Sequence, residues 1–411
     1  MCAGLCCPMA TRSQGLGACA ALAASSTRHR WGLILTYTNI FFSWEVSDHS
    51  GWGVYGFNLF MRAGHTPPFR AVPVKWPPSF LYPVDPISEL QMMDRLSLFE
   101  GNVEARRGDY MLTALGNTIK KYEVAAGIKE IGVIFFEINP LPAAEIEKLK
   151  SFDAIVAGST WNQEKLAEMG VASERVIQGI NTDLFRIQKK RNFKDRFVVF
   201  SGGKLECRKG QDIVLKAFSV FAKKHPEALL ITSWRSAWEK SIAPTINASG
   251  LCQPLVIEED FGVALDNWVL ANGVDRRQFV NLACAPNQLM PEVLREVDLA
   301  VFPNRCEGGT NLVAMEALAC GLTVAVADNT GQRDLVNTAR CIALRDQSQV
   351  PSDGVTCNVG WGETSVDELL AVMEDVYSQK IRLNPEEVRN SVLHWTWDHS
   401  IDELVGKIAR V

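Results

Sequence analysis

The sequence lacks any run of about 18 apolar residues, so we expect no integral membrane segment. It also lacks an excess of basic residues, because 42 Lys and Arg stand against 47 Asp and Glu, a formal net charge of −5. A general nucleic-acid-binding protein would show a dominant positive field. We therefore expect no nucleic acid as a partner, and any phosphate site has to be a local feature.

The patterns of a metal site are absent too. No Asp-x-Asp sequence occurs. Beyond residue 30 the histidines show no ligand-like spacing; they are His49, His65, His225, His394 and His399. We therefore predict that the protein uses no metal and no bound cofactor. Cationic side chains and a helix N-terminus would then take the role that a divalent ion has in other transferases.

Metal-type cysteine pairs are likewise missing from the body of the chain. Of the 11 cysteines, four lie in the first twenty residues and the other seven are scattered singly. A single cysteine in an apolar segment is usually a small buried hydrophobic residue. The pattern therefore predicts free thiols and a reducing compartment.

Acidic residues are absent from the start of the chain, where the first is Glu45. Residues 1–30 are rich in Ala, Ser, Gly and Cys, and their formal charges are Arg12, Arg28 and Arg30. This composition favours a cleavable targeting segment, which would place the protein in the cytoplasm or an organelle. A disordered extension would have the same composition, so both interpretations stay open.

From Trp31 onward, short apolar runs alternate with longer amphipathic stretches, as in parallel sheets covered by helices. Predicted strands span 31–37, 131–136, 153–158, 196–202, 227–234 and 298–303, and predicted helices span 145–150, 162–170, 210–225, 289–297 and 311–321. The length of 411 residues favours two domains. The basic segment 187–196 interrupts the alternation. We predict α/β domains at 31–186 and 187–390, with a closing helix at 391–411 that could pack back onto the first domain.

The most informative segment begins at Asn304 and reads NRCEGGTNLVAMEALACGLTVAVA, a strand end, a glycine turn, a helix and a strand. Gly308 and Gly309 would let the backbone approach a ligand. The amides of the next three residues would form a helix N-terminus suited to phosphate; they belong to Thr310, Asn311 and Leu312. Glu316, one turn further along, could accept hydrogen bonds from a ribose. The segment therefore predicts a nucleotide site.

A second segment, SGGKLECRKGQDIVLKAF from Ser201, places two cations at the mouth of one loop. Lys204 and Lys209, beside the flexible Gly203, suit a diphosphate whose negative charge grows as it departs. Arg208 is a weaker candidate because adjacent side chains tend to point apart. We predict that Lys204 and Lys209 stabilise a leaving diphosphate.

These two segments resemble the donor half of retaining glycosyltransferases with the GT-B architecture, above all glycosyltransferase family 4. The resemblance extends over residues 31–411. It implies two Rossmann-like, doubly wound domains facing each other across a cleft, with the donor held mainly by the second and the acceptor by the first. It also implies transfer of a sugar, a hexose being the natural expectation, from a nucleoside diphosphate sugar with retention. The acceptor, whether glycan, lipid or protein, is left unknown.

The resemblance rests on two motifs. Gly203, Lys204, Lys209 and Gly210 match the first at the family's spacing, with Lys204 where Arg is usual. The second has two glutamates with seven residues between them, whereas Glu307 and Glu316 enclose eight. Glu316 carries over, and by resemblance Glu307 would contact the donor sugar.

The first half resembles the family more loosely. Residues 50–65 are similar to its glycine-rich loop and helix, and Gly51 and Gly53 would border the donor phosphates. Glu137 stands near the position where many members have a histidine facing the acceptor. Thr330 and Gly331 follow the strand at 323–328 and are candidates for contact with the sugar or the acceptor.

Two alternatives remain open. A GT-B enzyme could handle nucleotide sugars without transfer to an acceptor, as an epimerase or a phosphorylase does. A binding protein could keep the fold and bind a nucleotide sugar without turnover. Release of the sugar would separate an enzyme from a binding protein.

Overall fold

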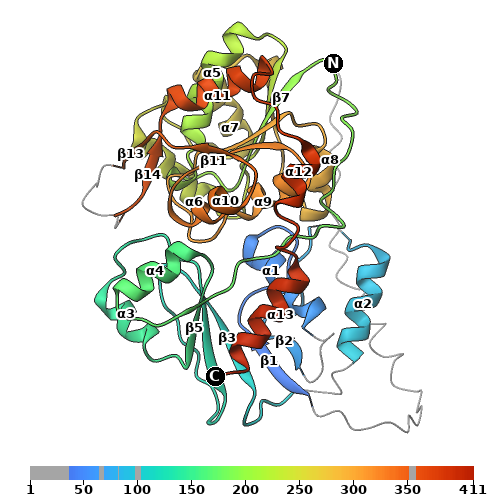
Figure 1. The fold of residues 1–411 in the computed structure, drawn as a ribbon, viewed down its shortest axis with the longest axis vertical. Coiled ribbons are helices and arrows are strands. Elements are labelled where there is room, and N and C mark those ends of the chain that lie inside the picture. The colour runs from blue at the N-terminus through green and yellow to red at the C-terminus, as the bar shows by residue number, and fades with distance from the viewer. Residues whose placement is uncertain (1–36, 64–68, 82, 98–102, 351–357) are drawn as a thin grey trace. The chain divides into compact units, whose positions relative to one another are not determined.

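Two six-stranded parallel sheets organise the part of the chain that the structure describes (Figure 1). The structure is a computed structural model, and it describes residues 37–63, 69–81, 83–97, 103–350 and 358–411. The predicted targeting segment, all of the predicted strand 31–37 except Tyr37, and His65 therefore lie outside the described residues. Tyr37 itself is not in a strand, and the first strand, β1, is Thr38–Phe42.

The first sheet has the strand order β2-β1-β3-β4-β5-β6, with every neighbouring pair parallel. Its other strands are β2 (Phe69–Pro73), β3 (Tyr110–Leu115), β4 (Lys129–Ile134), β5 (Ala154–Ala157) and β6 (Glu174–Arg175). Its helices are α1 (Gly51–Arg62), α2 (Pro86–Ser97), α3 (Ala143–Leu149) and α4 (Thr160–Glu168). In β4, Ile131, Val133 and Ile134 are all buried, as expected for a strand covered on both faces.

The second sheet has the order β12-β11-β10-β7-β8-β9 and is also fully parallel. Its strands are β7 (Phe197–Gly202), β8 (Ala228–Ser233), β9 (Phe279–Asn281), β10 (Leu299–Phe302), β11 (Thr323–Ala327) and β12 (Ile342–Leu344). Its helices are α5 (Gln211–Lys224), α6 (Glu239–Ile242), α7 (Phe261–Ala271), α8 (Met290–Leu294), α9 (Leu312–Ala319), α10 (Arg333–Thr338) and α11 (Val366–Tyr377). This is the doubly wound Rossmann order, and its direction reverses between β7 and β10. An antiparallel pair, β13 (Gln347–Gln349) and β14 (Gly362–Thr364), follows β12.

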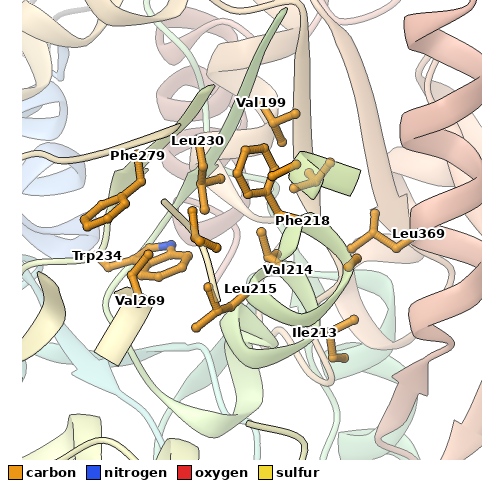
Figure 2. Close-up of a cluster of buried hydrophobic side chains, with 14 of the residues drawn as sticks. Val199, Ile213, Val214, Leu215, Phe218, Leu230, Trp234, Val269, Phe279 and Leu369 are labelled. Carbon is orange, nitrogen blue, oxygen red and sulfur yellow. The ribbon is translucent and has the colours of Figure 1, made fainter. Parts of the chain in front are cut away.

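The core of the second half fixes the helix that follows the cationic loop. Figure 2 shows Val214 and Phe218 of α5 among Val199 of β7, Leu230 of β8 and other buried side chains. Phe218 is fully buried, and burial of this kind stabilises a helix more than its intrinsic propensity does. The start of α5, two residues after Lys209, is therefore held firmly against the sheet.

The closing helix predicted over 391–411 is shorter in the structure. The chain forms α12 (Pro385–Asn390), leaves the helical conformation, and forms α13 (Trp397–Ile408). Thr396 caps α13 by accepting a hydrogen bond from the amide of His399, and Trp395 O accepts one from Ile180 N at 2.8 Å. This pairing with a distant segment of the same chain replaces helical hydrogen bonds in the residues before α13. From Trp397 on, α13 packs into the same core as α1 and β1.

The α/β prediction is confirmed by the two parallel sheets. The predicted boundary at residue 186 falls between β6 and β7. The strands predicted at 131–136, 153–158, 196–202, 227–234 and 298–303 correspond to β4, β5, β7, β8 and β10 within two residues at each end.

Candidate functional site

The candidate site lies where the direction of winding in the second sheet reverses. Gly203 and Lys204 follow the end of β7, and the loop from Pro303 to Glu307 follows the end of β10, the adjacent strand. Ligands of open α/β sheets bind outside the carboxyl ends of strands at such a reversal. The topology therefore brings the two predicted motifs together.

Lys209 and Arg208 converge on one carboxylate, that of Glu307. They lie on a short 3₁₀ turn, η2 (Cys207–Lys209). Lys209 Nζ pairs with Glu307 Oε1, and Arg208 Nη1 donates to Glu307 Oε2 at 2.9 Å. The expectation that Arg208 would point away from Lys209 is wrong, because a 3₁₀ turn followed by the left-handed Gly210 (φ 68°) lets both side chains reach the same loop.

Two further carboxylates complete this cluster. Glu206 lies 2.8 Å from Arg208 Nη2 and 3.5 Å from Lys204 Nζ. Glu137, which follows β4 in the first half, lies 3.4 Å from Arg208 Nη2. We call these six side chains the charged cluster: Glu137, Lys204, Glu206, Arg208, Lys209 and Glu307.

The neighbouring charges outweigh burial at Glu307 and Arg208 but not at Lys209. Burial lowers the pKa of the Lys209 ammonium, although the carboxylate of Glu307 opposes this. Burial opposes ionisation of Glu307, but the charges of Lys209 and Arg208 outweigh it and hold the pKa of this carboxyl below its ordinary value. Burial likewise opposes the charge of Arg208, and the carboxylates of Glu137, Glu206 and Glu307 outweigh it and raise the pKa of the guanidinium. A guanidinium and an ammonium that hold a carboxylate can hold a phosphate oxygen in its place.

Arg305 anchors the cationic turn, and no sequence pattern pointed to it. It is fully buried and donates to both carboxylate oxygens of Asp212, at 2.9 and 2.7 Å. It also donates to Cys207 O at 2.7 Å and to Glu363 of β14 at 2.7 Å. Arg305 therefore connects the turn that carries Lys209 to the start of α5 and to β14.

The glycine turn after Glu307 approaches protein rather than open space. A Cβ added to Gly308 would lie 2.7 Å from Phe136 O, and one added to Gly309 would lie 3.0 Å from the ring of Phe135. Ser159 Oγ, in the first half, donates to Gly308 O at 2.7 Å. These glycines make room for close packing of the two halves, and their approach to a ligand stays a prediction.

Thr330 and Gly331 hold the same turn through hydrogen bonds with the backbone of Glu307. Thr330 Oγ1 accepts from Glu307 N at 2.9 Å, and Gly331 N donates to Glu307 O at 3.0 Å. Both residues are buried. Their contacts hold Glu307 in position, so any role toward a sugar would be through that loop.

Replacing Gly331 with alanine is expected to lower the free energy of unfolding by about 1–3 kcal/mol, because the new Cβ would lie 2.1 Å from Gly309 O. Chemical denaturation of the full chain measures this. The control is Gly51→Ala, since nothing lies within 4 Å of a Cβ at that helix start, and it should change stability by less than about 0.5 kcal/mol. Equal effects of the two substitutions would contradict the packing described here.

The helix after the turn begins as predicted, but its first residues are occupied by protein contacts. Asn311 is the N-cap of α9, in a left-handed conformation (φ 70°), and its Oδ1 accepts from Ala314 N. Thr310 is fully buried and its hydroxyl contacts Met315 Sδ at 3.0 Å. Leu312 packs beside the aromatic side chains of the first half. A phosphate at this helix end remains a prediction.

Glu316 is buried and its Oε1 accepts from Asn287 Nδ2 at 2.6 Å. Burial raises the pKa of its carboxyl to about 8. At neutral pH the group is therefore mostly protonated and can donate as well as accept a hydrogen bond, which suits a pair of hydroxyls. Asn287 also forms a hydrogen bond with the first half, because its backbone N donates to Asp48 O at 2.7 Å.

Gly51 and Gly53 lie within the first turn of α1 rather than in a loop. Ser50 caps this helix by accepting from Gly53 N at 2.9 Å, and a Cβ on Gly53 would lie 1.7 Å from Ser47 Oγ. Trp52, between them, packs edge-on against Phe135 with 5.1 Å between ring centroids, and a Cβ added to Gly309 would lie 3.0 Å from the same Phe135 ring. One aromatic ring thus separates this helix start from the glycine turn.

Among the described residues, no group of three His, Cys, Asp or Glu side chains is arranged to hold a metal ion. The described cysteines are free thiols, as their scatter predicts: Cys207, Cys252, Cys284, Cys306, Cys320 and Cys341. No helix in the described part of the chain combines the length and apolar character needed to cross a membrane.

Residues 258–353 match the glycosyl transferases group 1 family. The matched segment runs through β10, α9 and β11 and so contains Glu307, the glycine turn and Glu316. Of the charged cluster, the matched segment contains Glu307. The search of curated proteins found no match to this chain.

Solved structures resemble nearly the whole chain. Sucrose-phosphate synthase from Thermosynechococcus elongatus has a TM-score of 0.61 at 12% identity, covering 91% of this chain and 98% of its own. HepE from Anabaena, in complex with UDP and glucose, has a TM-score of 0.57 at 11% identity, covering 91% and 100%. A glycosyltransferase from Rickettsia africae has a TM-score of 0.57 at 11% identity, covering 91% and 98%. At such low identities the likeness shows the fold, which is GT-B.

Proposed function

We propose that this protein is a glycosyltransferase that moves a sugar from a nucleoside diphosphate sugar to an acceptor, with retention and without a metal. The observation that carries the proposal is the convergence of Lys209 and Arg208 on Glu307 where the winding of the second sheet reverses. The match of that segment to glycosyl transferases group 1 supports it.

In this proposal Lys209 and Arg208, with Lys204 nearby, neutralise the diphosphate as the glycosidic bond to it breaks. Glu307 would turn from its cations to the donor sugar, and Glu316 would bind the ribose. A hexose from a uridine diphosphate sugar is the first donor to test, because HepE was solved with UDP-glucose. Retention follows from the resemblance to family 4 alone.

The test is to titrate uridine, guanosine and adenosine diphosphates into the full chain and to measure the midpoint of thermal unfolding at each concentration. A ligand that binds only the folded state raises this midpoint. We expect one diphosphate to raise it. Lys209→Ala is expected to lower the affinity for that diphosphate roughly 10- to 100-fold, because it removes one charged hydrogen bond.

Lys216→Ala is the matched control, since Lys216 is exposed on α5. It should leave the ligand-induced shift unchanged. A wild-type midpoint unmoved by all three diphosphates would contradict the proposal. Binding of a diphosphate sugar without release of its sugar would instead favour a non-catalytic binding protein.

A further inference from the structure

One carboxylate of the charged cluster comes from the other half of the molecule. Arg208 contacts Glu206 at 2.8 Å and Glu307 at 2.9 Å, both on its own half, and Glu137 at 3.4 Å across the interface. The side chain of Glu137 is 17% exposed, so this contact is largely withdrawn from solvent. The contact between Arg208 and Glu137 is thus the longest of the three, and it is the one that depends on how the two halves meet.

The backbone on either side of this carboxylate is held by a segment of the second half, residues 358–361, which we call the strap. Trp361 Nε1 donates to Glu137 O at 2.9 Å. Asn139 Nδ2 donates to Val359 O at 3.0 Å, and Val359 N donates to Asn139 O at 3.2 Å. The strap precedes β14, whose Glu363 contacts Arg305. Glu137 is therefore fixed beside Arg208 by contacts that its own side chain does not make.

The charges in the cluster balance, since three cations face three carboxylates. A diphosphate would add two or more negative charges to this balanced and mostly buried group, and like charges at such distances repel strongly. Besides Glu307, which the proposed function turns toward the donor sugar, a second carboxylate has to give way if the phosphate oxygens are to reach Arg208. Glu137 makes the longest contact of the three with Arg208 and comes from the other half of the molecule.

We propose that Glu137 competes with the diphosphate of the donor for Arg208, and that donor binding releases this carboxylate on the acceptor-binding half. The inference rests on the proposed function, because it takes the donor's diphosphate as the competing anion. Glu137 thereby links occupation of the donor site to the state of a residue in the other domain. The strap opposes the release.

The experiment compares diphosphate binding by the wild type and by Glu137→Gln, which keeps the shape of the side chain and removes its charge. With the diphosphate that binds the wild type, calorimetric titration should show an affinity about tenfold higher for the variant. The parent nucleoside, which has no phosphate, should show no change. Trp361→Phe, which removes the bond to Glu137 O and keeps an aromatic ring, should raise diphosphate affinity by a smaller factor.

The matched control is Glu147→Gln, because Glu147 lies on α3, is 72% exposed and pairs with Lys150 outside the cluster. It changes the net charge equally and should leave affinity as in the wild type. Unchanged or weaker diphosphate binding by Glu137→Gln would overturn the inference while leaving the proposed function intact. If neither wild type nor Glu137→Gln binds any diphosphate, the proposed function fails, and the inference fails with it.

Discussion

Replacing Arg305 with methionine is expected to lower the free energy of unfolding by about 3–5 kcal/mol, because it leaves the buried carboxylate of Asp212 without its partner. Both side chains are at most 1% exposed. Chemical denaturation followed by circular dichroism measures the change. The same substitution should also weaken diphosphate binding, since Arg305 holds the turn that carries Lys209.

Two comparisons make this expectation specific. Arg277→Met is the matched control, because Arg277 pairs with Asp275 at 2.9 Å but is 88% exposed, and it should change stability by less than about 1 kcal/mol. The double variant Arg305→Met, Asp212→Leu should recover much of the loss, because an apolar pair can replace a buried ion pair. A loss below about 1 kcal/mol for Arg305→Met would contradict the buried pairing.

Glu316→Gln is expected to remove a pH dependence of stability worth about 4–5 kcal/mol. The folded protein keeps this carboxyl protonated up to a pKa of about 8, whereas the unfolded chain releases the proton near 4.5. The stabilising contribution is therefore fully present below pH 4.5 and is lost as the pH rises toward 8. Above pH 8 the loss is complete.

The measurement is the free energy of unfolding of wild type and variant at several pH values between 4.5 and 8. The difference between the two proteins should shift by about 1.4 kcal/mol per pH unit in that window. Glu147→Gln, at an exposed position, should follow the wild type at every pH. A difference between wild type and Glu316→Gln that stays constant with pH would show that Glu316 ionises normally in the folded protein.

Much of the fold was predictable because buried parallel strands are short apolar runs. The run IGVIFF lies over β4, and RFVVFSG lies over β7, each within two residues. Several strands of the two sheets were not predicted, among them β2 and β9. β2 is FRAVP, which has a central buried alanine and ends in proline, and β9 has three residues, so neither contains an apolar run that stands out.

The candidate site was predictable as a place more than as a set of contacts. The predicted strands 196–202 and 298–303 placed both motifs at strand ends, and the doubly wound order brings those ends together. What Gly308 approaches could not be predicted, because a glycine that makes room for a ligand and one that makes room for Phe136 look the same in sequence. Arg305 was missed for a similar reason, since an arginine after a strand usually reaches solvent.

The balance of charge in the cluster has a consequence for the kinetics of binding. Electrostatic steering speeds association where a site presents a net potential of opposite sign to its ligand. Here the formal charges of the cluster cancel and the whole chain carries −5, so we expect no electrostatic acceleration of an arriving anion. Anions then differ in affinity through their dissociation rates. A ligand is retained only if its oxygens replace carboxylate oxygens on Arg208 and Lys209.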